Sequence, residues 1–284
     1  MKAGTSGVVC ALALTMLCAF SPFSRAGCNP AAQGFNAAGS DAKAMELADR
    51  TMDAMGGRQA WDGARVIGWT IFGRTHTWDK WTGDYRLEAD TTLVIMNVNT
   101  KQGRVWESGK EVTDTAKRDE TLKDAMSVWI NDSYWLLMPY KLKDTGVTLH
   151  YVGEQTTADG RAADAIQLTF AGVGDTPDNK YLVWIDKESG MVTQWAYFQK
   201  ATDAQPKFTL PWAKWTPFGP VKISVGRGKF DVTGVRVSST ADAKAFAAPS
   251  RFSSLRERYV RTRRSRTRAQ KSVRATRDFP PRPT

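Results

Sequence analysis

Few side chains in this sequence could build an acid–base or nucleophilic site, because the chain has only two histidines, His76 and His150. Neither stands in a spacing typical of a zinc site or of a metalloprotease helix. We therefore expect no metal and no cofactor. An enzyme would need a polar cluster inside a cavity, around His76, Asp79 or His150.

Other motifs that could carry chemistry are incomplete. Gly226-Arg227-Gly228 lacks the third glycine and the following helix of a dinucleotide-binding loop, so we interpret it as a turn between strands. The acidic stretch Asp175–Asn179 does not follow the spacing of an EF-hand. Carboxylate pairs such as Glu107 and Glu111 lie at turns beside lysines, where charge typically serves solubility. The sequence does not require an enzyme, and we expect none.

Large aromatic side chains are the most unusual feature of the composition, with 11 Trp and 12 Phe. An ordinary core would account for any single one of them. However, Leu93–Met96 and Tyr181–Ile185 are apolar on both faces, so a second element must cover them. A helix packed on a sheet would leave room for an apolar ligand. We predict that the cavity and its lid are lined by Trp69, Ile71, Trp106, Met126, Trp129, Trp135, Leu136, Trp184, Trp195 and Trp212.

The spacing of apolar residues predicts the elements that position these side chains. Apolar residues at helical spacing after Ser40, with a stop at Gly56-Gly57, predict an opening amphipathic helix. From Arg65 onward, short β-branched and aromatic runs alternate with turn residues, which predicts an antiparallel sheet. We expect strands at Val66–Phe72, Tyr85–Ala89, Thr92–Asn99, Gly103–Glu107, Val147–Glu154, Ala163–Phe170, Tyr181–Asp186, Met191–Phe198, Phe208–Trp215, Val221–Val225 and Lys229–Val237.

In the middle of the chain the period changes to that of a helix. A second apolar run, Tyr134–Met138, follows Asp132-Ser133 and is halted by Pro139. We predict two short helices, or one broken helix, over 122–138, and this segment is the one expected to move as a lid. One helical face would carry Leu122, Ala125, Met126, Trp129 and Ile130.

Three stretches carry a resemblance to a known family: Met55-Gly56-Gly57 with Trp61, Tyr134–Leu142, and Tyr181–Lys187 leading to Gly190. With this order of parts, the chain resembles the bacterial lipoprotein-carrier superfamily of the LolA/LolB type, also called outer-membrane lipoprotein-sorting-like proteins. The resemblance implies a mainly β fold. A curved antiparallel sheet would form an incomplete barrel, with an N-terminal helix and a mid-chain helical lid over a hydrophobic cavity that accepts acyl chains. These are signatures of a fold and assign no individual contact.

The N-terminus is typical of a secretory signal peptide, with Lys2 before the uncharged run Val8–Phe20. Cleavage after Ala26 suits ordinary signal peptidase, whereas the sequence up to Cys28 resembles a lipobox in which Arg25 is unusual. Both interpretations stay open. The other two cysteines lie within the signal, so Cys28 would be the lone thiol of the mature chain, as a lipidation site would be. We expect an exported, periplasmic protein, either free or anchored to the outer membrane through Cys28.

The net charge of +11 is unevenly distributed. Twelve of the 40 Lys and Arg residues lie between Arg251 and Thr284, beside only two acidic residues, so the rest of the chain is nearly neutral. We expect a disordered tail that either has no partner or docks on the envelope membrane surface, and no nucleic-acid partner. The predicted organisation is a signal peptide (1–27), a tether without fixed structure (28–39), a single half-barrel domain (40–248) and the basic tail (249–284).

These observations predict an exported, monomeric carrier that binds the acyl chains of a lipid or lipoprotein in a hydrophobic cavity under a helical lid. Two alternatives remain. One is a ligand-free structural or interaction module of the cell envelope, and the other is an exported enzyme on the same fold.

Overall fold

The computed structural model of the protein describes residues 29–247. The predicted signal peptide, Cys28 and the basic tail lie outside the described residues. Within 29–247, no helix combines the length and the hydropathy that crossing a membrane takes.

Two helices open the domain: α1 (Ala42–Ala54) and the short α2 (Arg58–Gly63). Between them, Gly56 and Gly57 have φ angles of 118° and 86°, which glycine adopts without the steric cost that a Cβ would bring. The predicted opening helix and its stop are therefore confirmed, and the glycine pair allows the chain to turn into α2.

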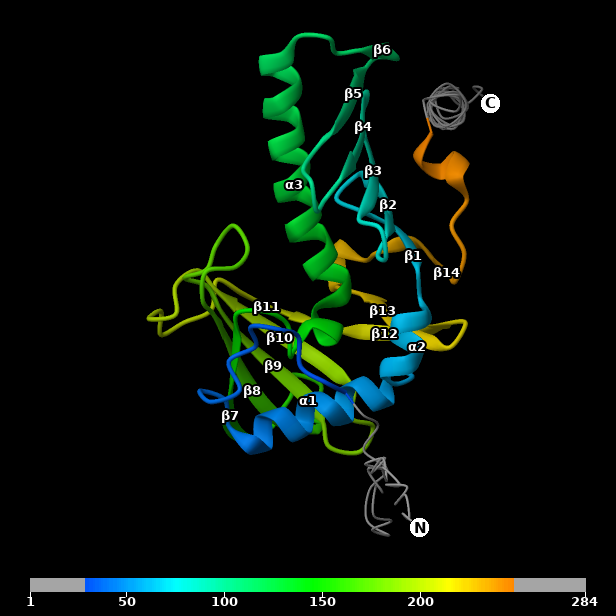
Figure 1. Ribbon diagram of the computed structural model, residues 1–284. Coiled ribbons are helices and arrows are strands. Elements are labelled where there is room, and N and C mark those ends of the chain that lie inside the picture. Colours follow the sequence, from blue (N-terminus) through cyan, green and yellow to red (C-terminus); the bar gives the residue numbers. More distant parts are fainter. Residues whose placement is uncertain (1–28, 248–284) are drawn as a thin grey trace, which may run out of the picture.

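Seven strands form an antiparallel sheet in the order β14-β1-β2-β3-β4-β5-β6, which occupies the upper part of Figure 1. The last strand of the described chain pairs with the first, since Val66 lies opposite Ser238. The strands are β1 (Val66–Ile71), β2 (Arg74–Asp79), β3 (Asp84–Ala89), β4 (Thr92–Asn97), β5 (Gly103–Glu107), β6 (Lys110–Glu111) and β14 (Thr233–Ser238).

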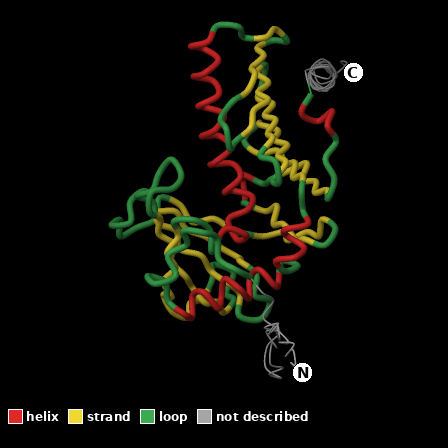
Figure 2. The backbone as a smooth tube through the Cα atoms, in the orientation of Figure 1, coloured by secondary structure: helices red, strands yellow, loops and turns green. Residues whose placement is uncertain are grey.

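Two further antiparallel sheets lie below it in the orientation of Figure 1 and Figure 2: a two-stranded sheet in the middle of the molecule and a five-stranded sheet at its lower end. A five-stranded sheet has the order β11-β10-β9-β8-β7, and a two-stranded sheet pairs β12 with β13. Their strands are β7 (Val147–Thr156), β8 (Ala162–Phe170), β9 (Lys180–Asp186), β10 (Val192–Phe198), β11 (Phe208–Pro211), β12 (Ala213–Phe218) and β13 (Val221–Gly226).

Helix α3 (Thr115–Leu137) connects the two ends of the molecule (Figure 1). Its N-terminus is capped by the Asp114 side chain, which accepts a hydrogen bond of 2.8 Å from the Lys117 amide. The break expected at Asp132-Ser133 is absent. Both residues are buried inside one continuous helix, because the polar side chain of Asp132 has a tertiary partner, Arg74.

Helix α3 packs on several buried clusters. Its N-terminal half places Leu122 and Ala125 against the seven-stranded sheet. Its C-terminal end places Leu136 and Leu137 in a central cluster. Tyr134 and Trp135, near the same end, pack against a third cluster between α1 and the five-stranded sheet. The helix is therefore a shared wall of both halves of the fold.

Some strand boundaries differ from the prediction. Strand β2 was not predicted, because Arg74–Asp79 is mostly polar. The expected strand Phe208–Trp215 divides at Trp212, where β11 and β12 join different sheets. The segment expected to start a strand at Lys229 begins instead as a 3₁₀ turn, Gly228–Phe230.

The segment 29–39 is not the structureless tether that its composition suggested. Its backbone amides at Ala32 and Asn36 donate to the carbonyls of Lys143 and Val147, at 2.9 and 3.0 Å. Phe35 packs against the core cluster under α1. These contacts fix the segment on the domain.

The expectation of a mainly β, antiparallel fold with a mid-chain helix is confirmed. The single curved sheet of an incomplete barrel is not what residues 29–247 form: their strands make three separate sheets, none of them closed. The physical reason is that α3 is inserted between β6 and β7, while the backbone changes sheets at Trp212.

Candidate functional site

A cavity of about 810 Å³ lies between α3, the five-stranded sheet and the loop 171–179. The C-terminal half of α3 forms one side of the cavity, and the end of β8 and the start of β9 form the other. Side chains of these elements that form its apolar wall are Met126, Trp129, Ile130, Tyr134, Phe170 and Tyr181.

The wall of the cavity is continuous with the aromatic core behind it. The ring of Tyr134 lies 5.2 Å from that of Tyr181 and meets Phe170 edge-on at 6.1 Å. Tyr181 stacks on Trp195 at 5.4 Å, and Trp135 meets Trp195 edge-on at 5.1 Å. Such contacts hold aromatic rings in fixed orientations, so the wall has a defined shape.

The opening of the cavity is polar. Thr145, Asp175 and Thr176 line it and are exposed, which places the mouth beside the loop 171–179. Lys141 and Asp144 also line it and form an ion pair of 2.5 Å. The arrangement combines an apolar interior with a charged rim, which suits an amphiphilic ligand.

Behind the cavity, four side chains form a buried polar network that joins β2 and β3 to α3. Arg74 lines the cavity and donates two hydrogen bonds to the Asp132 carboxylate, from Nε to Oδ2 at 2.7 Å and from Nη2 to Oδ1 at 2.8 Å. His76 Nε2 lies 3.1 Å from Asp132 Oδ2, without the geometry of a regular hydrogen bond. His76 Nδ1 lies 2.8 Å from the Tyr85 hydroxyl. We assign the proton to Nε2, so that Tyr85 donates to Nδ1.

Burial dominates the electrostatics of this network. It lowers the pKa of His76, against the opposing effect of Asp132, so the imidazole is held neutral. Burial alone would raise the pKa of Asp132, but contacts from His76, Arg74 and Asn131 outweigh it and hold that pKa below its ordinary value. The hydrogen bond to Asp132 raises the pKa of Arg74. The result is a permanent Arg–carboxylate pair beside a neutral histidine.

A second buried cation holds the C-terminal end of α3. Arg227 is fully buried, and its Nε and Nη2 donate to the carbonyl of Trp135, at 3.1 and 2.9 Å. This carbonyl belongs to the last turn of the helix, where backbone acceptors lack helical partners and the helix dipole favours a cation. The guanidinium also lies 3.3 Å from the ring centroid of Trp212. Arg227 thereby fixes the part of α3 that carries Trp135.

Three of the residues predicted to line a cavity do line this one: Met126, Trp129 and Trp135. The rest do not. Trp69 stacks on His76, Ile71 and Leu136 fill the central cluster, and Trp195 lies behind the wall. The remaining three are buried elsewhere. Trp106 lies in β5, Trp184 donates its indole N–H to the side chain of Gln155, and the ring of Trp212 is covered by the guanidinium of Arg227.

Several cavity residues were not predicted: Arg74, Ile130, Tyr134, Phe170 and Tyr181. The sequence could have indicated Tyr181, because this residue lies near the start of a strand that is apolar on both faces. No sequence pattern indicated that Arg74 lines the cavity, because strand β2, to which it belongs, was not predicted.

The polar cluster that an enzyme would need was expected around His76, Asp79 or His150, and none of these three residues lines the cavity. His76 is fully buried against Trp69. Asp79 pairs with Arg65 at 2.9 Å. His150 lies on β7, in the other sheet, and its Nδ1 is 3.6 Å from Asp41. Among residues 29–247, no group of three or more His, Cys, Asp and Glu side chains is placed to hold a metal ion.

Comparison with known proteins gives structural neighbours only. No protein-family model matches the chain, and no curated protein matches it. A DUF1329 family protein from Desulfovibrio piger has a TM-score of 0.39 and 13% identity, over 72% of this chain and 97% of that one. A LolA superfamily protein from Nitrosomonas europaea has a TM-score of 0.30 and 8% identity, over 72% and 97%. The Pseudomonas aeruginosa MucA/MucB complex gives a TM-score of 0.22 and 13% identity, over 74% and 62%.

The structural neighbours thus include a LolA superfamily protein, in line with the resemblance seen in the sequence. Because these TM-scores lie below 0.5, the likeness carries no argument about what the chain binds.

Proposed function

We propose that the chain binds the acyl chain of a lipid or lipoprotein in the cavity beside α3. The observation that supports this is a half-open cavity of about 810 Å³ whose lining is mainly apolar. Pockets for small molecules typically span about 300–1,000 Å³ and have mostly apolar walls. Burial of each methylene group contributes about 0.8 kcal/mol. An acyl chain therefore needs an apolar trough and few specific polar contacts.

The rim supports an amphiphilic ligand rather than a plain hydrocarbon. Lys141, Asp144 and Thr145 stand at the mouth, where the head group of a bound lipid would lie. Arg74 adds a cation to the wall, already neutralised by Asp132. On this proposal the affinity comes from the buried chain, and the rim tolerates different head groups.

The predicted signal peptide supports a place for this activity in the periplasm, with the protein either free or anchored to the outer membrane through Cys28.

Binding is better supported than catalysis. A general acid or base must come within hydrogen-bond reach of its substrate. The His76 and Asp132 side chains are fully buried, and the neutral imidazole is turned toward Tyr85 and Asp132. Of the buried network, the only member that reaches the cavity is Arg74.

The test places a charge on the cavity wall. Ile130 lines the cavity and is half-buried, outside the four core clusters. Ile130→Glu should weaken the binding of an environment-sensitive fluorescent fatty acid at least about tenfold, because a carboxylate is costly to bury beside an acyl chain. The matched control is Ile95→Glu, on β4, at a half-buried isoleucine that does not line the cavity.

The control variant should bind the probe as the unaltered protein does. Equal affinity in Ile130→Glu, or an equal loss in Ile95→Glu, would show that the cavity is not the binding site. Native mass spectrometry of the purified protein should in addition find bound lipid.

A further inference from the structure

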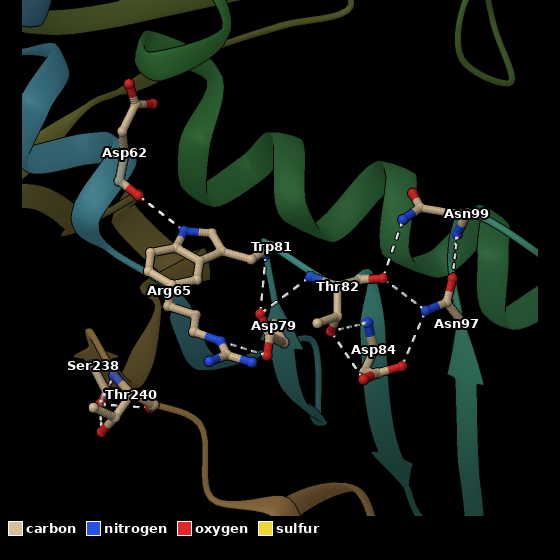
Figure 3. A network of polar contacts seen from close by, with 10 residues as sticks. All are labelled: Asp62, Arg65, Asp79, Trp81, Thr82, Asp84, Asn97, Asn99, Ser238 and Thr240. Carbon is tan, nitrogen blue, oxygen red and sulfur yellow. Dashed lines mark hydrogen bonds and ion pairs between the residues drawn. The ribbon is translucent and has the colours of Figure 1, made fainter.

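Trp81 is the most exposed of the large apolar side chains in the described part of the chain, with 56% of its surface accessible. It lies in the turn between β2 and β3 and is held in place rather than free. Its indole Nε1 donates to the carbonyl of Asp62 at 2.9 Å, and its amide donates to Asp79 Oδ1 at 3.0 Å (Figure 3). The Arg65 guanidinium lies 5.1 Å from its ring centroid. An indole held in an exposed position presents a fixed apolar surface to a partner, which is of interest where further aromatic and charged groups adjoin it.

A second indole and further cations adjoin Trp81. Trp61, on α2, is half-buried and stacks on Tyr140 at 4.2 Å, while the Lys80 ammonium lies 4.6 Å from its ring centroid. Arg58, also on α2, pairs with Asp62 at 2.8 Å. We call Trp61, Trp81, Arg58, Arg65 and Lys80 the Trp81 face.

The described chain begins beside this face. Arg58 Nη1 donates to the carbonyl of Pro30 at 3.1 Å, and Lys143 Nζ donates to the carbonyl of Asn29 at 2.7 Å. Asn29 and Pro30 share a small cavity of about 190 Å³ with Arg58 and Trp61. A continuous set of contacts therefore runs from Pro30 through Arg58 and Asp62 to Trp81.

We propose that the Trp81 face rests on the head-group region of a phospholipid bilayer. Tryptophan suits that region because its ring is apolar while its N–H is polar. The three cations of the face outnumber the two carboxylates paired with them, Asp62 and Asp79, and can meet lipid phosphates. Residues 1–28 precede Asn29, so a membrane anchor at Cys28 would hold this same face against the bilayer.

This inference shares with the proposed function the premise of an envelope membrane, but it does not depend on the cavity. The test is cosedimentation of the exported chain, cleaved of its predicted signal peptide, with phosphatidylcholine vesicles at high salt. Salt suppresses the ionic contacts of the basic tail and of the face itself, so the contribution of the indole is what remains. Every variant carries Cys28→Ser, so that no acyl chain contributes. Trp81→Ala should lower the partition coefficient about tenfold, because the exposed indole would otherwise leave water on binding.

Two further variants separate a membrane contact from a structural role. Trp81→Phe loses the same hydrogen bond to Asp62 but keeps an apolar ring, so it should retain most of the binding. Val152→Ser, at another exposed apolar side chain, on β7, should bind like the parent. All variants should bind the fluorescent fatty acid equally, which keeps failure of this inference distinct from failure of the proposed function.

Three outcomes would overturn the inference. One is an absence of vesicle binding by the parent protein. Another is equal binding by Trp81→Ala and the parent. The last is an equal loss in Trp81→Phe and Trp81→Ala, or in Val152→Ser, which would assign the effect to folding or to general hydrophobicity.

Discussion

Substitution of Asp132 by asparagine tests whether the buried network fixes α3 to the seven-stranded sheet. The carboxylate accepts two hydrogen bonds from Arg74 and a third, of 2.8 Å, from the side chain of Asn131. Asparagine has nearly the same shape but carries no charge and turns one acceptor into a donor. Asp132→Asn therefore leaves Arg74 without its counter-ion and with one hydrogen bond lost.

The cost follows from burial. Breaking a buried ion pair typically costs about 3–5 kcal/mol because a charge is left without a partner. Arg74 keeps 29% of its side-chain surface accessible and can recover part of its hydration, whereas Asp132 has none. We therefore expect the free energy of unfolding to fall by about 3 kcal/mol, near the lower bound. In a domain of this size that corresponds to a drop in melting temperature of about 6–12 °C.

Urea unfolding at neutral pH, followed by circular dichroism, measures this loss. The matched control is Asp119→Asn on the same helix, because Asp119 pairs with Arg118 at the surface. An exposed pair contributes at most about 1 kcal/mol. A loss in Asp132→Asn no larger than in this control would refute the reasoning. So would full additivity with Arg74→Met, since coupled residues must show an interaction energy.

Two further predictions concern the histidine and the glycine pair. Since burial lowers the pKa of His76 from its usual 6.5, the unfolded chain binds more protons below that pH. Stability should therefore fall as the pH drops below 6.5. His76→Gln should flatten this slope in urea unfolding curves, and an unchanged slope would contradict the assignment. Gly56→Ala should cost at least about 2 kcal/mol more than Gly57→Ala in the same assay, because overpacking adds to a backbone strain that both share. A Cβ on Gly56 would lie 2.2 Å from the Pro220 carbonyl oxygen, whereas one on Gly57 would meet nothing within 4 Å, so equal losses would contradict this prediction.

The elements that the sequence could predict are those whose burial follows a simple period. The hairpin of β7 and β8 and the pair β9 and β10 alternate or run apolar over enough residues to be recognised. Strand β2 was not recognised because its buried residues, His76, Thr77 and Asp79, are all polar. These polar residues are buried only because tertiary partners satisfy them, and no local pattern reveals such partners.

The same limit applies to the cavity. Helical periodicity placed Met126 and Trp129 on one face of a helix, and both line the cavity. Periodicity could not distinguish a tryptophan at a cavity from one in a filled core, because both positions are apolar. Trp69 and Trp212 belong to the second kind, since His76 and Arg227 cover their rings. Which aromatic side chains face empty space depends on how the sheets and α3 meet.

The contacts of α3 also bear on how a ligand would reach the cavity. The sequence favoured 122–138 as a moving lid, yet this helix is joined to the seven-stranded sheet through Asp132 and to Arg227 through the Trp135 carbonyl. Lifting it would break a buried ion pair, at a cost of about 3 kcal/mol or more. The opposite wall is cheaper to displace, because residues 174–178 of the loop 171–179 are exposed. We therefore expect α3 to be the fixed wall of the cavity and the loop 171–179 to be the side that moves when a ligand enters.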